Sequence, residues 1–297
     1  MERFVYKKLR EFDMKKNYKL FRLFQKLANP KFNKRRSYKD VKIDLLTRKV
    51  KVRVFTPPKN NNRLIIYLHG GGWVAGSIDS YTNICYNLAH KTESTVMAIS
   101  YRLAPEHPFP AGFNDCYDVI RLVYSSSELL NIDPKNIVIM GDSAGGNLTA
   151  AVCQRAIDTK DFKVYKQILL YPALQSDYSK DTKYKSVIEN GSSYIISRTQ
   201  LCDFMEHYVK NKEDLDNKYV APLLSNNLFR MPKTLIITAD NDPLRDEGIE
   251  YAKKLKKFLV KVKHYNFYGA AHGFLTNILD ESYTELAYEK IIEFLGD

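Results

Sequence analysis

The chain of 297 residues is long enough to bury a large hydrophobic core without disulfide bridges or metal ions. Hydrophobic residues make up 44% and charged residues 27%, a balance that excludes an intrinsically disordered, collagen-like or small disulfide-stapled protein. The 46 Lys and Arg residues outnumber the 34 Asp and Glu residues and give a formal net charge of +12, which raises the question of an anionic partner.

The positive charge is spread along the chain, and its densest runs are residues 31–36 and 253–257. The second run lies on a predicted amphipathic helix, so we expect solubility charge and no nucleic-acid partner. No stretch approaches the roughly 20 apolar residues of a membrane-spanning helix. The N-terminal residues lack the apolar core of a signal peptide, and the four scattered cysteines form no metal-ligand pattern. We therefore expect a cytoplasmic protein without stable membrane insertion; secretion through a signal outside this sequence is the alternative.

Hydrophobic periodicity predicts an α/β protein. Leu20, Leu23, Phe24 and Leu27 recur at helical spacing and predict at least one helix within residues 1–38. Strands are predicted at residues 52–55, 64–68, 96–100, 137–140, 168–171, 235–238 and 262–267. Helices are predicted at residues 81–90, 114–130, 144–157, 199–210, 247–259 and 283–295. This alternation predicts a mostly parallel central sheet flanked by helices.

Residues 174–230 form a long, polar, Tyr-rich insertion between two predicted strands, with a helix near its middle. Insertions of this kind often cover the carboxyl ends of the strands, where ligands of α/β sheets bind. We therefore predict a lid over a binding site; a surface excursion without a role is the alternative.

A G-x-S-x-G pattern directly follows the predicted strand 137–140 and precedes a predicted helix. In this context the pattern indicates a tight turn that holds Ser143 at a strained backbone position. Gly141 and Gly145 would remove the Cβ atoms that would otherwise clash in such a turn. The following helix would direct its N-terminal N–H groups toward the serine oxygen. Ser143 is therefore the candidate nucleophile.

A second glycine cluster, HGGGW at residues 69–73, follows the predicted strand 64–68. Three successive glycines let the backbone approach a ligand closely and present free N–H groups. Such donors stabilise the negative oxygen of a tetrahedral intermediate in acyl transfer. A flexible turn or a phosphate-binding loop is the alternative, although no G-x-x-x-x-G-K-[ST] motif is present.

A serine nucleophile needs a base and a further residue that orients the base. His272 is the candidate base, because small residues flank it in a loop directly after a predicted strand. Four other histidines lie on predicted surface helices, in a predicted strand or in a Pro-rich loop: His90, His207, His264 and His107.

Three carboxylates compete to orient this base, all in the segment after the sixth predicted strand. Asp242 precedes a proline, which keeps it out of helical geometry and in a loop. Asp246 fits better as a cap or first-turn acid of the next helix, and Asp240 is the second choice. The order Ser143, Asp242, His272 is that of the α/β-hydrolases.

Five motifs occur along the chain: HGGGW at 69–73, YRLAPE at 101–106, GDSAGG at 141–146, DPLRDEG at 242–248 and HGF at 272–274. In this order they resemble the hormone-sensitive-lipase-type carboxylesterases, over roughly residues 45–297. The resemblance implies an α/β-hydrolase fold with a helical cap. It divides the chain into N-terminal cap helices (1–40), a catalytic domain (41–173 and 231–297) and an inserted cap segment (174–230).

The resemblance also implies an activity, the hydrolysis of short-chain, acetyl-like carboxylic esters through an acyl-enzyme. Ser143, Asp242 and His272 would be the catalytic residues, and YRLAPE would be a structural support. The oxyanion hole would be formed by three backbone N–H groups, those of Gly71, Gly72 and Ala144. No metal or organic cofactor is implied, and the partner is a small-molecule ester. Related hydrolases often form homodimers, although the sequence carries no dimerisation signal.

Two other functions stay open at this point. A non-catalytic small-ligand binding protein could use the same fold, since fold alone is a poor guide to function, although the candidate triad is intact. A peptidase or aryl-amidase would share the serine triad, although nothing indicates a propeller domain or an acid pair that anchors an amine.

Overall fold

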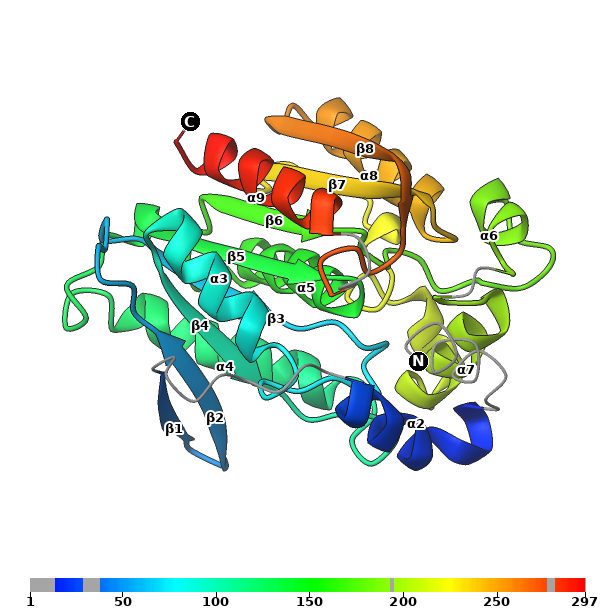
Figure 1. Cartoon of the computed structure of the whole chain (residues 1–297), viewed down its shortest axis with the longest axis horizontal. Coiled ribbons are helices and arrows are strands. Elements are labelled where there is room, and N and C mark those ends of the chain that lie inside the picture. Colours follow the sequence, from blue (N-terminus) through cyan, green and yellow to red (C-terminus); the bar gives the residue numbers. More distant parts are fainter. Residues whose placement is uncertain (1–13, 29–37, 193–194, 277–280, 297) are drawn as a thin grey trace.

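A computed structural model of the chain describes residues 14–28, 38–192, 195–276 and 281–296. Within these residues, one sheet of eight strands has the order β1-β2-β4-β3-β5-β6-β7-β8 (Figure 1). The strands are β1 (Lys39–Leu45), β2 (Arg48–Phe55), β3 (Leu64–Leu68), β4 (Thr95–Ser100), β5 (Ile137–Asp142), β6 (Lys166–Leu170), β7 (Lys233–Asn241) and β8 (Val262–Ala271). Strand β2 is antiparallel to both of its neighbours, and all pairs from β4 to β8 are parallel. The predicted α/β fold with a mostly parallel sheet is confirmed.

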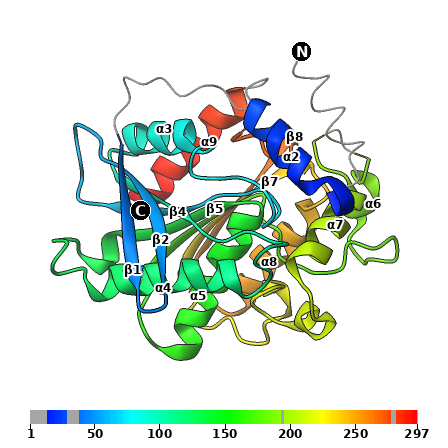
Figure 2. The same cartoon turned by 90° about the horizontal axis from the view of Figure 1, so that it is seen from below.

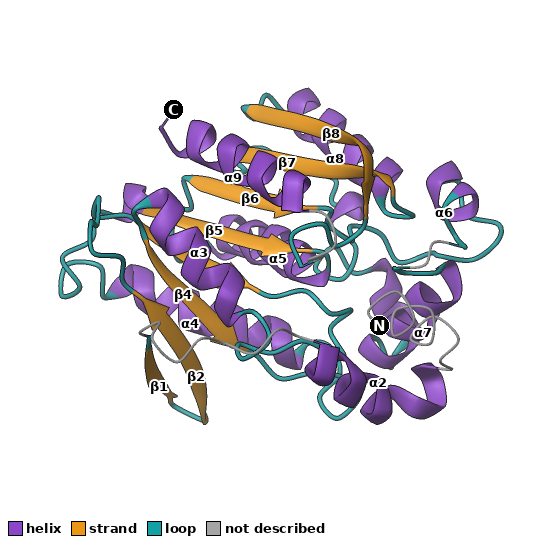
Figure 3. Cartoon of the chain, in the orientation of Figure 1, coloured by secondary structure: helices purple, strands orange, loops and turns teal. Residues whose placement is uncertain are grey.

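Helices cover both faces of this sheet (Figures 2 and 3). One face is covered by α3 (Thr82–Thr92) and α9 (Glu281–Gly296). The other face is covered by α4 (Ala111–Ser125), α5 (Ala144–Thr159) and α8 (Arg245–Lys257). The connections contain the short 3-10 helices η1 (Pro134–Asn136), η2 (Lys212–Asp216) and η3 (Pro222–Leu224). The central strands β3, β5 and β6 are therefore buried on both sides, as their continuous apolar runs require.

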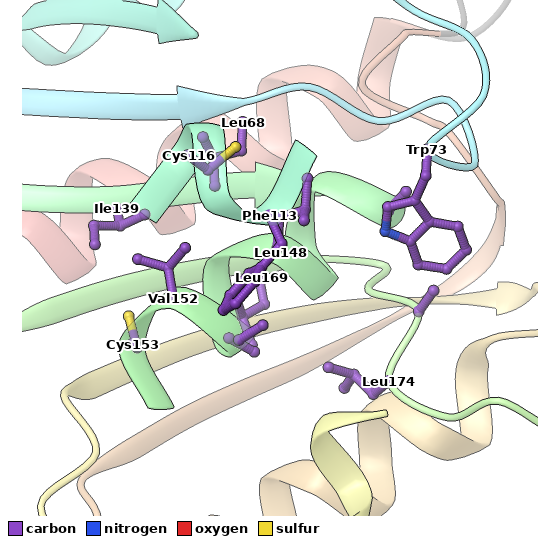
Figure 4. Close-up of a cluster of buried hydrophobic side chains, with 14 of the residues drawn as sticks. Leu68, Trp73, Phe113, Cys116, Ile139, Leu148, Val152, Cys153, Leu169 and Leu174 are labelled. Atoms are coloured by element: carbon purple, nitrogen blue, oxygen red, sulfur yellow. The ribbon is translucent and has the colours of Figure 1, made fainter. Parts of the chain in front are cut away.

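Strand β3 shows how a continuous apolar run serves both layers, because successive side chains of a strand point to opposite faces. All five of its residues are buried. The even-numbered side chains join the hydrophobic cluster that includes α4 and α5, and the odd-numbered ones join the cluster that includes α3 and α9. Figure 4 shows part of the first cluster, in which strand and helix side chains meet: Leu68, Phe113, Cys116, Ile139 and Leu148.

The sequence prediction missed β1 and the first half of β2. In β1, Lys and Asp alternate with Val, Ile and Leu, and its side chains are exposed or half-buried at the edge of the sheet. The prediction of a helix over residues 114–130 was also too long at its C-terminal end, since α4 ends at Ser125. Leu129 and Leu130, which extended the apolar pattern, are exposed, so no buried contact favours a longer helix.

The predicted N-terminal helix is present as α2 (Met14–Ala28). It packs against the rest of the protein through Tyr18 and Phe21, whereas Leu20 and Leu23 are exposed. The side chains of the other two residues used for this prediction, at 24 and 27, lie outside the described residues.

The insertion at residues 174–230 contains α6 (Lys185–Glu189) and α7 (Arg198–Tyr208). Figure 1 shows α2, α6 and α7 beyond the ends toward which β5 and β6 point. Phe21 of α2 contacts Phe204 of α7 edge to face, with ring centroids 6.0 Å apart, and Tyr18 contacts His207 in the same way at 5.4 Å. His207 is thus buried, and its predicted place on a surface helix was wrong because α2 covers it.

Of the two basic runs in the sequence, the structure describes the second. Residues 31–36 lie outside the described residues. In the second run, Lys253, Lys256 and Lys257 are exposed on α8, whose opposite face buries Tyr251 and Leu255. Among the described residues, no helix has both the length and the apolar character needed to cross a membrane.

Candidate active site

Ser143 occupies the turn between β5 and α5, at a strained backbone conformation of φ 52° and ψ −120°. The glycines on either side permit this turn. A Cβ atom on Gly141 would collide with the carbonyl oxygen of Gly145, and a Cβ atom on Gly145 would collide with the carbonyl oxygen of Leu68. The spacing of the G-x-S-x-G motif is therefore a steric requirement here, and it leaves Ser143 at the N-terminus of α5.

The side chains of Ser143, His272 and Asp242 form a continuous chain of hydrogen bonds. The Oγ atom of Ser143 is 3.0 Å from Nε2 of His272, and Nδ1 of His272 is 2.8 Å from Oδ2 of Asp242. Because a carboxylate only accepts, Nδ1 carries the proton and Nε2 is left to accept from the serine hydroxyl. All three side chains are buried. They come from the turns after β5, β7 and β8, which are brought together by the parallel sheet.

The two competing carboxylates lie elsewhere. Asp240 accepts hydrogen bonds from the side chain of Asn266 and the N–H of Gly269. Asp246 is in the first turn of α8, as expected, and accepts from the N–H of Ser186. Of the three candidates, the structure brings Asp242 to the imidazole, and the N–H of Leu244 holds its second oxygen at 2.9 Å.

The HGGG segment forms a tight turn after β3, with φ of 118° at Gly71 and 60° at Gly72. The side chain of His69 fixes its start: Nδ1 is 2.8 Å from the carbonyl oxygen of Gly70, and the ring stacks on Tyr101 at 4.3 Å. Burial lowers the pKa of His69 to about 4, so this histidine is a neutral structural group. Within the described residues, no group accepts a hydrogen bond from the N–H of Gly71, Gly72 or Ala144.

Helix α7 packs directly on this glycine turn, a contact that sequence reasoning missed. A Cβ atom on Gly72 would lie 2.5 Å from the ring of Phe204. The next residue, Trp73, stacks on Tyr208 with ring centroids 4.5 Å apart and an interplanar angle of 6°. The apolar periodicity of α7 could have indicated a buried face, but no sequence signal identified its partner.

Helix α2 is tied to the same region through Arg22. Its Nε donates to the carbonyl oxygen of Val74 at 2.6 Å, and Nη2 donates to that of Ala104 at 2.7 Å. The guanidinium also binds both carboxylate oxygens of Glu106 and holds the pKa of that group at about 2. The expected structural role of the YRLAPE motif fits these contacts, since Glu106 anchors α2 and does not touch the triad.

Glu247, in the first turn of α8, is a fully buried carboxyl group outside the triad. Its Oε1 accepts from the N–H of Leu174 at 2.9 Å and from the hydroxyl of Tyr178 at 3.3 Å, whereas Oε2 has no hydrogen-bond partner among the described residues. Burial raises the pKa of Glu247 well above its usual range. The neutral, protonated form is therefore favoured in the folded protein.

We expect Glu247→Gln to reduce the loss of stability with rising pH. Above the usual glutamate pKa of 4.5, the unfolded chain ionises at this position while the folded protein keeps the proton. Rising pH therefore favours unfolding of the wild type, with a slope that approaches about 1.4 kcal/mol per pH unit for one proton. Glutamine is neutral in both the folded and the unfolded state, so it contributes no pH dependence of this kind. Urea unfolding at pH 4, 6 and 8 gives the free energy of unfolding of both proteins. The same decrease of this free energy with pH in wild type and variant would contradict the prediction.

Among the described residues, no group of three or more His, Cys, Asp or Glu side chains is arranged to hold a metal ion. The polar centre of the site is the hydrogen-bonded chain from Ser143 to Asp242, next to the glycine turn. An alcohol nucleophile, an oriented imidazole and free backbone N–H groups define the class of serine hydrolases.

Comparison with known proteins agrees with this class. Residues 65–276 match the model of an α/β-hydrolase-fold family, so the chain belongs to that family. The chain is 34% identical to an arylesterase of Saccharolobus solfataricus over 80% of this chain and 76% of the relative. It is 31% identical to an ethyl acetate hydrolase of Pseudomonas putida over 78% and 74%, respectively. The structure of a hyperthermophilic esterase from Pyrobaculum calidifontis superposes with a TM-score of 0.87 at 28% identity, covering 99% of this chain and 96% of that one.

These relatives confirm the resemblance to hormone-sensitive-lipase-type carboxylesterases and the expected ester-cleaving activity. The chain is a carboxylesterase-type serine hydrolase.

Proposed function

We propose that Ser143, His272 and Asp242 are the catalytic triad of a carboxylesterase that acts on small, short-acyl esters. The observation that carries the proposal is the pair of hydrogen bonds at 3.0 Å and 2.8 Å that join the three side chains. In this arrangement His272 accepts the serine proton, and Asp242 holds the imidazole in the tautomer that can do so.

In the acylation step, Oγ of Ser143 attacks the ester carbonyl carbon while Nε2 of His272 takes the hydroxyl proton. The carbonyl oxygen becomes negative, and the N–H groups of Gly71, Gly72 and Ala144 would donate to it. The N–H of Ala144 lies at the N-terminus of α5, where the helix dipole also favours negative charge. Collapse of the intermediate transfers the proton from His272 to the leaving alcohol and leaves the acyl group on Ser143.

Water completes the cycle by the same steps in reverse. His272 removes a proton from the water, the resulting hydroxyl attacks the acyl-enzyme, and the proton returns to Ser143 as the acid leaves. Neither a metal ion nor an organic cofactor is required for any of these transfers.

The preference for a small acyl group is supported by the aromatic side chains against the glycine turn. Phe204 is in contact with Gly72, and Trp73 is buried in a parallel stack with Tyr208. These rings fill space beside the proposed oxyanion site. We propose that α2 and the insertion at 174–230 form the cap that brings them there, with the catalytic domain at 41–173 and 231–297. A cytoplasmic location is also proposed, and the four free thiols are compatible with it.

A panel of nitrophenyl esters tests the substrate class. We expect kcat/KM to be highest for acetate or butyrate and to fall for octanoate and longer acyl chains, because the aromatic rings restrict the site. Highest turnover at C10 or above would contradict the short-acyl proposal. Nitroanilides of the same acids serve as the comparison, since faster amide than ester turnover would indicate an amidase. We expect an organophosphate to label one site per protein molecule, and the amount of label gives the concentration of active sites.

A further inference from the structure

Another buried carboxylate, Asp142, lies beside the proposed triad and takes no part in the proposed proton transfers. It is the last residue of β5 and directly precedes Ser143. Its side chain is almost fully buried, and no Lys or Arg of the described residues forms an ion pair with it. Burying a carboxylate without a cationic side-chain partner costs free energy, because the charge loses its hydration, and hydrogen bonds must offset this cost.

Among the described residues, three hydrogen-bond donors surround this carboxylate. Oδ1 accepts from the hydroxyl of Tyr67 and from the N–H of Gly70, both at 2.9 Å, and Oδ2 accepts from the hydroxyl of Tyr81 at 2.8 Å. Hydrogen bonds of this kind favour the ionised form of a carboxyl group. Glu247 differs in this respect, because one of its carboxyl oxygens has no hydrogen-bond partner in the part of the chain that the structure describes. Asp142 is thus equipped to carry its charge inside the protein.

The hydrogen bond to Gly70 connects Asp142 to the glycine turn. Gly70 directly precedes the two glycines of the proposed oxyanion hole, and Asp142 directly precedes the nucleophile. The contact is close, because a Cβ atom on Gly70 would lie 2.6 Å from Oδ2 of Asp142. One side chain therefore links the turn that carries the serine to the turn that would bind the oxyanion.

The charge of Asp142 also acts on the imidazole. Ser143, its neighbour in the chain, is hydrogen-bonded to His272, and Tyr171 lies edge to face against the same imidazole at 5.0 Å. Burial raises the pKa of Asp142, and its hydrogen bonds and the positive charge of a protonated His272 oppose that rise. By reciprocity, an ionised Asp142 favours the imidazolium that forms during acylation.

We propose that Asp142 is a positioning residue of the hydrolysis: its buried negative charge stabilises the imidazolium of His272 while its side chain anchors the glycine turn at Gly70. This inference rests on the proposed function of the triad. It assigns Asp142 no contact with the substrate and no proton transfer of its own.

The phenols and the thiol around Asp142 allow a clean test, because they stay uncharged near neutral pH. Among the described residues, the groups that face Asp142 are a phenol of β3, three phenols of the surrounding loops, a thiol of α3 and the imidazole: Tyr67, Tyr81, Tyr101, Tyr171, Cys85 and His272. Burial holds the pKa values of the four phenols and the thiol above their usual range. Asp242 and Ser143 are hydrogen-bonded to the imidazole.

The test is the pH profile of kcat/KM for nitrophenyl acetate with Asp142→Asn, which removes the charge and keeps an acceptor for Gly70 and Tyr67. We expect the midpoint of the acidic limb to move down by roughly 0.5 to 1 pH unit, because the imidazolium loses a nearby opposite charge. The corresponding loss in kcat is about 3- to 10-fold per active site titrated with the organophosphate. If Asp142→Asn does not fold, Asp142→Ser removes the same charge and leaves room for a water molecule.

Glu247→Gln is the matched control, since it makes the same change at a buried carboxyl group that the structure keeps neutral. It should leave the acidic limb and kcat unchanged. An Asp142 variant whose acidic limb stays at the wild-type position overturns the inference, whether or not kcat falls, because a purely structural role would not move that limb. If Ser143→Ala retained the activity, the proposed triad itself would be wrong. The Ser143 variant therefore tests the proposed function, and the Asp142 variant tests the role of Asp142.

Discussion

Ser143→Ala should lose essentially all ester hydrolysis, with kcat reduced by about 10⁵- to 10⁶-fold. The reason is that no other hydroxyl of the described residues lies within hydrogen-bonding distance of Nε2 of His272. Loss of the nucleophile leaves only substrate binding and the oxyanion donors, which together still exceed the uncatalysed rate. Nitrophenyl acetate turnover measures the loss, and the mass of the intact variant after organophosphate treatment shows whether any other residue has been labelled.

This variant should fold as the wild type does. Alanine keeps the Cβ atom, so the strained φ of 52° is neither relieved nor worsened. The backbone hydrogen bonds of residue 143 with Leu170, Asn147 and Ala173 do not involve the side chain. The melting temperature should therefore stay close to that of the wild type.

Ser125→Ala is the matched control, because Ser125 is an exposed serine at the end of α4 whose hydroxyl donates to the carbonyl oxygen of Leu122. It should keep full turnover and full labelling. Wild-type turnover or labelling in Ser143→Ala would refute the triad, because another group would then have to be the nucleophile.

The sequence predicted most of the sheet and the three polar residues at its edge. Both could be predicted because they depend on the residues of a short segment of the chain. A buried parallel strand such as Leu64–Leu68 needs a continuous apolar run, and the turn at Ser143 needs small residues at 141 and 145. The preference for Asp242 over Asp240 also came from a local rule, the restriction that a following proline places on the backbone.

The sequence did not reveal what depends on distant contacts. Asp142 lies within the GDSAGG motif, but its role depends on Tyr67 and Tyr81, which lie 75 and 61 residues away. His207 carries no local sign of burial, because the helix that covers it lies near the N-terminus. β1 escaped detection because an edge strand with charged residues at alternate positions lacks the apolar run of a central strand.

Asp242→Asn should reduce kcat by about 10⁴-fold while preserving the fold. The carboxylate of Asp242 accepts two hydrogen bonds, from the N–H of Leu244 at 2.9 Å and from Nδ1 of His272 at 2.8 Å. An amide oxygen can replace one acceptor only. If it stays on Leu244, the NH₂ group faces Nδ1 and forces the imidazole into the tautomer with a proton on Nε2. That tautomer cannot accept a proton from Ser143.

Asp240→Asn is the control that separates the two carboxylates between which the sequence alone could not decide firmly. Its contacts with Asn266 and Gly269 are long and outside the triad, at 3.4 Å and 3.3 Å. We therefore expect turnover close to that of the wild type. A larger loss for Asp240→Asn than for Asp242→Asn would show that the imidazole takes a different partner during catalysis.

The double variant Ser143→Ala/Asp242→Asn extends this prediction. If the three groups act as one unit, orienting the imidazole has no value once the nucleophile is gone, so the double variant should be no slower than Ser143→Ala alone. A further drop would mean that Asp242 supports hydrolysis independently of the serine, for example by orienting His272 to activate water directly. The residual rate of the single and double variants with nitrophenyl acetate decides between these outcomes, with thermal unfolding to confirm that both are folded.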